Sequence, residues 1–366
     1  MKTKRAAHFV NSPYLVDNPS NYTLISALVE LGWQVDVYTS NPGLDLSHYG
    51  PSVHAAHAEF GYRWLASNLL HPRWMAYDLF SGTTEEPMAA AGLLARLYRK
   101  PCITIADEIK SGSTAGERSA RWKALCRFGM RASRLTVVNE AERVRVQRDY
   151  AHLAADHPIV VMPNCFPDPP TLLDRASLRA ERGIPQDALV VCFSGVFNIY
   201  NGGVWYAQAL ARKSDTWFWA QVVPQDPMAG ALLPWLHGHE RQVIEPGPMG
   251  WRLPWATMCA ADIGTVVYLQ DAPQFRHMGV ASNRLCMFLT AGVPVIASRQ
   301  PSFEFIEDYD CGVLVNSADE YVAAIDAIRP RLAQMSANAR RCAREYIDAP
   351  GRYRALVQAI SDVKPA

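Results

Sequence analysis

A helix start with a basic residue in its first turn is the feature of this sequence that points most clearly to chemistry. Ser282-Asn283-Arg284 opens an apolar stretch that is closed by Gly292. Serine before a helix and glycine after it are typical end residues, so we predict a helix over 283–290. The unpaired N–H groups and the positive dipole end of its first turn suit a phosphate. Arg284 opposes that dipole unless an anion lies there, although a solvent-facing arginine on an ordinary helix explains the pattern equally well.

A glycine-rich segment, 195–203, offers a second set of backbone donors. It follows an apolar run and contains Gly195, Asn198 and Asn201. Backbone N–H groups of such a loop can bind phosphate, and a plain tight turn is the competing interpretation. Arg276, shortly before Ser282 in the sequence, supplies a further cation. No Asp-x-Asp pair that could hold a metal–diphosphate complex is evident, so we predict a site without metal or other cofactor.

Polar and acidic side chains follow strand-like runs in the first half of the chain. They are Asn11, Asn18, Asn21, Glu85, Asp107 and Glu108. Asparagine and carboxylate groups at the carboxyl ends of parallel strands suit the hydroxyls of a sugar-like ligand, and Asp107 or Glu108 could orient such a hydroxyl or accept its proton. The competing interpretations are Asx turns and helix caps, which use the same residue types.

The elements that must position these residues alternate between short apolar strands and longer helical patterns. Strands are expected at 6–10, 34–39 and 76–81, for example, and prolines between 163 and 170 interrupt the alternation. Because 366 residues exceed the size of a single core, we predict an α/β chain of two Rossmann-like, doubly wound domains facing a central cleft. The predicted parts are a first domain over 1–164, a linker over 165–187, a second domain over 188–342, and a C-terminal helix over 343–366 that packs back on the first domain.

The segment 282–298 resembles the donor-binding helix of GT-B glycosyltransferases of the retaining group 4 type, in which Ser-Asn-Lys/Arg-Leu and Ala-Gly-x-Pro-Val-Ile are common. Glu245-Pro-Gly-Pro-Met249 and Pro301-Ser-Phe-Glu304 resemble further loops of that family. The resemblance implies transfer of a sugar, with retention, from a nucleoside-diphosphate sugar to a glycan, a lipid-linked acceptor or a small molecule. It places the base near Gly247 and Met249, the donor sugar near Glu304, and the diphosphate near Ser282, Asn283, Gly195, Asn198 and Asn201.

The sequence departs from this family at the charged positions that usually hold the donor. Gly279 and Met287 stand where two glutamates are frequent, and Val196 and Asn201 stand where an arginine and a lysine are frequent. We therefore assign the missing positive charge to Arg276 or Arg284. The same departures keep open a degenerate transferase that binds without catalysis. A nucleotide-sugar epimerase of the same architecture is a second alternative, which would need acid and base residues in the cleft.

Charge and hydropathy restrict the partners. The 36 basic and 35 acidic residues leave a net charge of +1, so no general field recruits nucleic acid. The N-terminus lacks the apolar core of a signal peptide and no apolar run is long enough to span a bilayer, which predicts a cytoplasmic protein. One basic amphipathic stretch could attach it to the inner face of an anionic membrane, although a solvated helix face is the commoner explanation. Its cations are Lys123, Arg127, Arg131 and Arg134.

Overall fold

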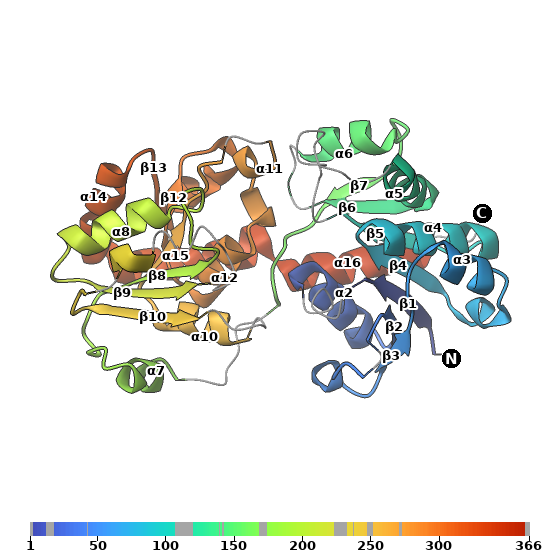
Figure 1. The fold of residues 1–366 in the computed structure, drawn as a ribbon, viewed down its shortest axis with the longest axis horizontal. Coiled ribbons are helices and arrows are strands. Elements are labelled where there is room, and N and C mark those ends of the chain that lie inside the picture. The colour runs from blue at the N-terminus through green and yellow to red at the C-terminus, as the bar shows by residue number, and fades with distance from the viewer. Residues whose placement is uncertain are drawn as a thin grey trace. The chain divides into compact units, whose positions relative to one another are not determined.

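The computed structural model divides the chain into two compact units. Unit 1 comprises Met1–Phe166 and Ala349–Ala366, and unit 2 comprises Pro167–Asp348 (Figure 1). The structure describes residues 3–11, 18–41, 43–106, 120–138, 140, 143–167, 174–222, 233–236, 238–246, 252–270 and 273–362. Asp107, Glu108, Gly247 and Met249 lie outside these ranges, and so does the side chain of Glu85.

Unit 1 is built on a sheet of seven parallel strands in the order β3-β2-β1-β4-β5-β6-β7. The strands β5 and β6, with the sequences CITI and LTVV, are buried along their whole length, as expected where helices cover both faces of a sheet. The strands are β1 (Arg5–Val10), β2 (Gln34–Thr39), β3 (Val53–His57), β4 (Leu79–Thr83), β5 (Cys102–Ile105), β6 (Leu135–Val138) and β7 (Ile159–Val161).

Helices cover both faces of this sheet. Along β1, Val10 packs with the apolar faces of α2 (Pro19–Glu30) and α16 (Ala349–Asp362), whereas Phe9 packs with α4 (Glu85–Tyr98). The C-terminal helix α16 is thus part of the core of unit 1. The remaining described helices are the 3₁₀ turns η1 (Ser47–Tyr49) and η2 (Pro72–Ala76), and α3 (Tyr62–Asn68), α5 (Ala120–Ala132) and α6 (Arg143–Ala151).

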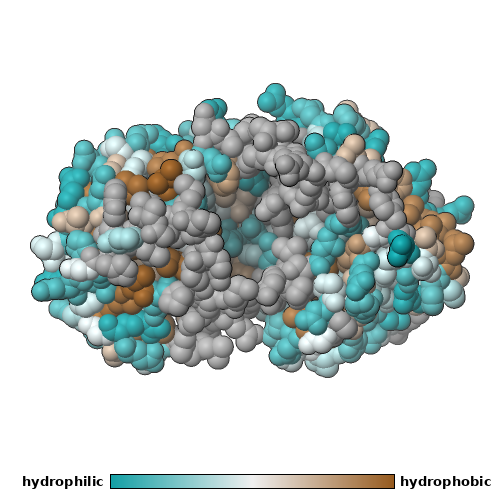
Figure 2. Space-filling model, viewed as in Figure 1, coloured by the Kyte–Doolittle hydropathy of each residue, from teal (hydrophilic) through white to brown (hydrophobic). Residues whose placement is uncertain are grey.

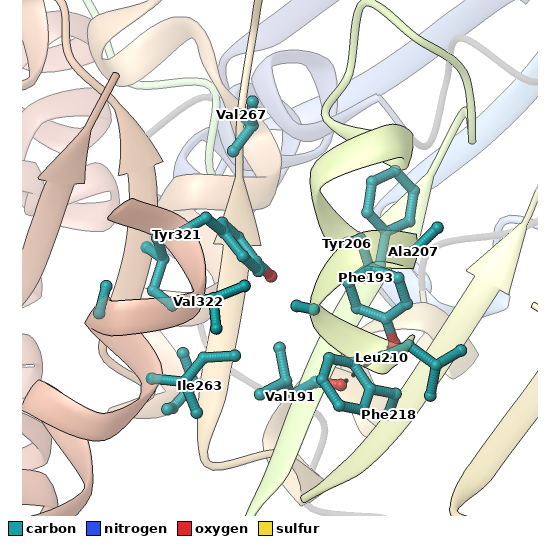
Figure 3. Close-up of a cluster of buried hydrophobic side chains, with 14 of the residues drawn as sticks. Val191, Phe193, Tyr206, Ala207, Leu210, Phe218, Ile263, Val267, Tyr321 and Val322 are labelled. Atoms are coloured by element: carbon teal, nitrogen blue, oxygen red, sulfur yellow. Dashed lines mark hydrogen bonds between the residues drawn. The ribbon is translucent and has the colours of Figure 1, made fainter. Parts of the chain in front are cut away.

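Unit 2 has a sheet of six parallel strands in the order β10-β9-β8-β11-β12-β13. Figure 3 shows the core on one face of this sheet, where Phe193, Phe218 and Ile263 pack against Tyr206 and Tyr321 from the covering helices. The strands are β8 (Val190–Gly195), β9 (Trp217–Val222), β10 (Gln242–Pro246), β11 (Ile263–Val266), β12 (Val295–Ser298) and β13 (Gly312–Val315).

The helices of unit 2 include one from the segment that the sequence assigns to the linker. This helix, α7 (Arg175–Glu181), packs within unit 2, because Arg179 is fully buried and forms an ion pair with Asp262. The other described helices are α8 (Gly203–Arg212), α10 (Arg252–Ala260), α11 (Pro273–Arg276), α12 (Asn283–Ala291), α13 (Phe305–Asp308), α14 (Ala318–Ile328), α15 (Leu332–Cys342) and the turns η3 (Leu233–Leu236), η4 (Gly279–Ala281), η5 (Pro301–Phe303), η6 (Arg329–Arg331) and η7 (Ala343–Ile347). Both units confirm the predicted α/β class with parallel sheets.

Candidate functional site

The strand order of unit 2 defines one position where a ligand is expected. The chain proceeds outward from β8 through β9 to β10, and outward in the other direction from β11 through β12 to β13. The neighbouring strands β8 and β11 therefore form the topological switch point, where the connections leave in opposite directions and open a crevice at the carboxyl ends. Ser194 and Gly195 end one side of this crevice, and Val267 and Tyr268 continue the other.

The guanidinium group of Arg284 lies at this switch point. Its Nη1 donates to the carbonyl oxygen of Ser194 at 3.1 Å, and its Nη2 lies 3.5 Å from the carbonyl oxygen of Val267. The rings of Phe193 and Tyr268 flank it, each with its centroid 5.1 Å from Cζ. Arg284 is only 6% exposed, and its buried Nε has no hydrogen-bond partner. The sequence predicted this residue for a phosphate, and the fold brings it to the end of two strands.

A second buried arginine shows what Arg284 lacks. Arg179 is fully buried, but its Nη2 donates to Asp262 Oδ2 at 2.7 Å and its other nitrogens donate to three backbone carbonyls. Asp262 also accepts from the backbone N–H of Val190, so it is a structural residue directly before β11. For Arg284 no carboxylate partner is found in the described part of the chain. A buried charge without a counter-charge is costly, so Arg284 favours an anion in the crevice.

The N-terminus of α12 reaches the same crevice. Ser282 is its N-cap, because Ser282 Oγ accepts from the N–H of Leu285 at 3.2 Å, and Gly292 closes the helix with a left-handed φ of 76°. The hydroxyls of Ser282 and Tyr268 lie 2.8 Å apart, which ties the helix start to the segment after β11. Asn283, in the first turn, is exposed. The positive end of the helix dipole therefore adds to the charge of Arg284.

The loop between β8 and α8 is shaped to lie over the end of β11. Asn198 Oδ1 accepts from the N–H groups of Tyr200 and Asn201 at 3.0 and 2.9 Å, so this oxygen holds the loop in shape. Gly202 has a φ of 81°, and a Cβ there would lie 2.5 Å from Cβ of Val267. Only glycine allows this approach. No side chain caps α8, and the N–H of Gly203 at its start donates to the carbonyl oxygen of Asn198 at 2.9 Å.

Two other expected residues follow neighbouring strands at the same edge of the sheet. Arg276 ends the short helix α11 after β11, and Glu304 precedes α13 after β12; both are exposed. Gln300, after β12, joins the two segments, because its Oε1 accepts from the N–H of Met278 at 2.9 Å. No contact of Arg276 or Glu304 with Arg284 is found, so their roles toward a ligand stay predictions.

Unit 1 has its own switch point, between β1 and β4. Asn11, directly after β1, donates from Nδ2 to Oε2 of Glu86 in the first turn of α4. The sequence singled out Glu85 at this turn, and the neighbouring Glu86 is the residue whose carboxylate reaches across from β4 to Asn11. Thr84, between the end of β4 and the start of α4, has a φ of 71°, in a region that a β-branched residue rarely adopts. A paired amide and carboxylate at a strand crossover suit the hydroxyls of a sugar.

The other two asparagines expected on this side have structural roles. Asn18 is the N-cap of α2, since its Oδ1 accepts from the N–H of Ser20 at 3.0 Å. Asn21 is fully buried, and its Oδ1 accepts from the hydroxyl of Thr83 at the end of β4. The capping interpretation of the sequence is thus realised for Asn18, and Asn21 joins α2 to the switch point.

His8 is a buried titratable group beneath this crossover that the sequence did not single out. Its Nδ1 lies 2.8 Å from Ser81 Oγ on the paired strand β4. Burial lowers the pKa of His8 to about 4, against an opposing effect of the hydrogen-bonding side chain of Asn21. The imidazole is therefore neutral at pH 7, and it belongs to the polar packing under the site.

Metal ligation and membrane crossing have no support in the described structure. Within the described ranges no group of three or more His, Cys, Asp or Glu side chains could hold a metal ion. In the same ranges, no helix has both the length and the apolar content that crossing a bilayer requires. Independence from metal stays a prediction.

Solved structures with the same fold include glycosyltransferases and a putative epimerase. HepE of Anabaena, in complex with UDP-glucose, aligns with 98% of this chain and 100% of its own at 16% identity and a TM-score of 0.71. A glycosyltransferase from Rickettsia africae aligns with 99% of both chains at 12% identity and a TM-score of 0.76. A putative UDP-N-acetylglucosamine 2-epimerase from Listeria monocytogenes covers 100% of this chain and 99% of its own at 12% identity and a TM-score of 0.57.

These likenesses define the class of fold. The chain has the GT-B fold of two Rossmann-like units, as the sequence resemblance implied. No protein-family model matches the chain, and no curated protein matches it. Identities of this size establish the fold alone, so the reaction must be argued from the site.

Proposed function

We propose that this protein is a glycosyltransferase that uses a nucleoside-diphosphate sugar as donor. The diphosphate would lie at the β8–β11 switch point of unit 2, against the guanidinium of Arg284 and the N-termini of α8 and α12. The observation that carries the proposal is the burial of Arg284 without a carboxylate partner among the described residues, at the position where this fold class binds ligands.

The reaction would break the bond between the anomeric carbon and the diphosphate and form a bond from that carbon to an acceptor oxygen. Negative charge develops on the leaving phosphate, and Arg284 and the helix N-termini would stabilise it. With retention, the acceptor proton can pass to the leaving phosphate, so no protein base is required. With inversion, Asp107 or Glu108 is the proposed base.

On the acceptor side, we propose that Asn11 and Glu86 bind hydroxyls of a glycan, a lipid-linked acceptor or a small molecule. A lipid-linked acceptor would bring the protein to the inner face of a membrane. Of the cations of α5 expected to contact it, Arg127 donates from Nε to the carbonyl oxygen of Tyr150 at 2.6 Å. It is thus engaged within unit 1, which disfavours α5 as the membrane contact.

Isothermal titration with a panel of UDP-, GDP-, ADP- and CDP-sugars tests the donor. We expect one nucleotide class to bind, and its hydrolysis or transfer to be detected when acceptors are added. The likeness to the putative epimerase from Listeria supports the epimerase alternative. An epimerase would interconvert epimers of the donor without any acceptor. Binding without turnover would favour a non-catalytic binding subunit, and no binding to any member of the panel would rule out the donor site.

A further inference from the structure

Three large apolar side chains are exposed on two segments of unit 1 that the hydroxyl of Tyr98 joins. Leu70 is 79% exposed, Met75 in η2 is 68% exposed, and Leu97 in the last turn of α4 is 45% exposed. We call them the Leu70 surface. Figure 2 shows hydrophobic residues at the margin of unit 1, where α3 and α4 lie in Figure 1. Apolar side chains exposed as a group mark an interaction site more often than single ones do.

Hydrogen bonds hold the Leu70 surface together. The hydroxyl of Tyr98, at the end of α4, lies 3.1 Å from the carbonyl oxygen of Leu69 and 3.2 Å from that of His71. The buried Trp74 donates from Nε1 to the carbonyl oxygen of Asn68 at 2.6 Å. The segment that carries Leu70 is thus fixed at both sides, and its apolar side chains are presented by a folded scaffold.

Exposed basic residues lie on the two segments that carry the Leu70 surface. Neither 60–77 nor 87–106 contains an aspartate or a glutamate, and of the acidic residues that flank 60–77, Asp78 lies 3.9 Å from Lys100 Nζ while Glu59 is exposed. The exposed cations are Arg63, Arg73, Arg96 and Arg99. None of these four forms an ion pair with a carboxylate in the described part of the chain. The guanidinium of Arg73 instead stacks over Trp74, with Cζ 4.6 Å from the ring centroid.

Exposed apolar side chains beside arginines suit an anionic lipid bilayer better than a second copy of this chain. A symmetric contact with a second copy would bring the same arginines together and would be opposed by their repulsion. In a bilayer of anionic lipids, by contrast, the apolar side chains enter the region below the headgroups while the arginines meet the phosphates. Each cation near such a surface strengthens binding by about fivefold.

We infer that unit 1 docks on an anionic lipid bilayer through the Leu70 surface. The inference goes beyond the proposed reaction and does not depend on it. It also differs from contact through α5, whose described apolar side chains are less exposed. Leu125 and Phe128 of that helix are half-buried and Met130 is fully buried.

Co-sedimentation with vesicles of phosphatidylcholine, with and without phosphatidylglycerol, tests the inference. The native protein should bind only the vesicles with phosphatidylglycerol, and less at high salt. The double variant Leu70→Ser/Met75→Ser should bind about tenfold more weakly, because apolar burial is lost. Arg96→Gln/Arg99→Gln should bind about 25-fold more weakly, with a smaller dependence on salt.

The variant Lys123→Gln/Arg131→Gln is the matched control, since it removes the same charge from α5. Its vesicle binding should be unchanged. All variants should keep the circular dichroism and nucleotide affinity of the native protein, which separates this test from that of the donor site. Equal binding to both vesicle types, or loss of binding in the α5 variant alone, would overturn the inference. A dimer that dissociates on Leu70→Ser would assign the surface to contacts between copies.

Discussion

Arg284 and Arg179 are buried arginines of the same unit, and only Arg179 has a carboxylate partner. The sequence singled out Arg284 by its place in a helix start, but it could not show that the side chain turns toward Ser194, 90 residues earlier in the chain. Local pattern identifies which helix begins there. The direction of a side chain depends on the strands that pack against the helix.

Replacing Arg284 by methionine should weaken binding of the preferred nucleoside diphosphate by about 10- to 100-fold. This fold-change corresponds to the free energy that a charge-assisted hydrogen bond contributes. Isothermal titration measures it. Arg179→Lys is the control: it should lower the free energy of unfolding through Asp262 and leave the affinity unchanged. Unchanged affinity in Arg284→Met would remove Arg284 from the donor site.

His8 makes the stability of unit 1 depend on pH. Its pKa in the folded state, about 4, lies below the ordinary value of 6.5, so the unfolded chain binds the proton more readily. The contribution is fully present above pH 6.5, falls as the pH decreases, and is lost at about pH 4; the pKa difference corresponds to about 3 kcal/mol. Urea unfolding of His8→Asn should show a flatter profile between these pH values. Parallel profiles of variant and native protein would contradict the assignment.

At the scale of elements, the ends of α12 follow directly from Ser282 and Gly292, as the sequence predicted. A strand was expected at 76–81, but β4 spans Leu79–Thr83, because the preceding residues form the turn η2 around the buried Trp74. Element ends with capping residues can thus be located from local chemistry. The start of β4 depends on an aromatic core that forms only in the folded unit.

The loop over the switch point should be sensitive at Gly202. Alanine there would place Cβ against Val267 and displace the loop from β11, so we expect nucleotide affinity to fall about tenfold or more. Gly238→Ala is a matched control, since its φ is also positive, at 87°, but nothing lies within 4 Å of a Cβ. Titration of both variants separates backbone strain from displacement of the loop. An equal effect in the two would refute this role of Gly202.

At the scale of the whole molecule, each unit has its own core, and the chain returns to unit 1 at its end. Tyr353 of α16 is fully buried in the core of unit 1, and Tyr321 of α14 is fully buried in that of unit 2. Contacts of this kind join residues that are far apart in the sequence. They make α16 part of the core of unit 1.

Truncating either tyrosine should therefore affect one unit. Tyr353→Ala should destabilise unit 1 by about 3–5 kcal/mol, and Tyr321→Ala should do the same to unit 2. In calorimetry we expect two transitions, one lowered by each variant, and a nucleotide should raise only the transition of unit 2. A single transition lowered equally by both variants would show that the units unfold together.

The sequence by itself determined the alternation of strands and helices, the ends of α12 and the α/β class, because hydrophobic period and capping residues act over a few neighbouring positions. It also supplied the resemblance that named the fold. Only the tertiary structure decided that Arg284 meets Ser194 without a carboxylate and that Glu86 meets Asn11. Both meetings occur where the strand order reverses, and strand order is set by the packing of distant segments.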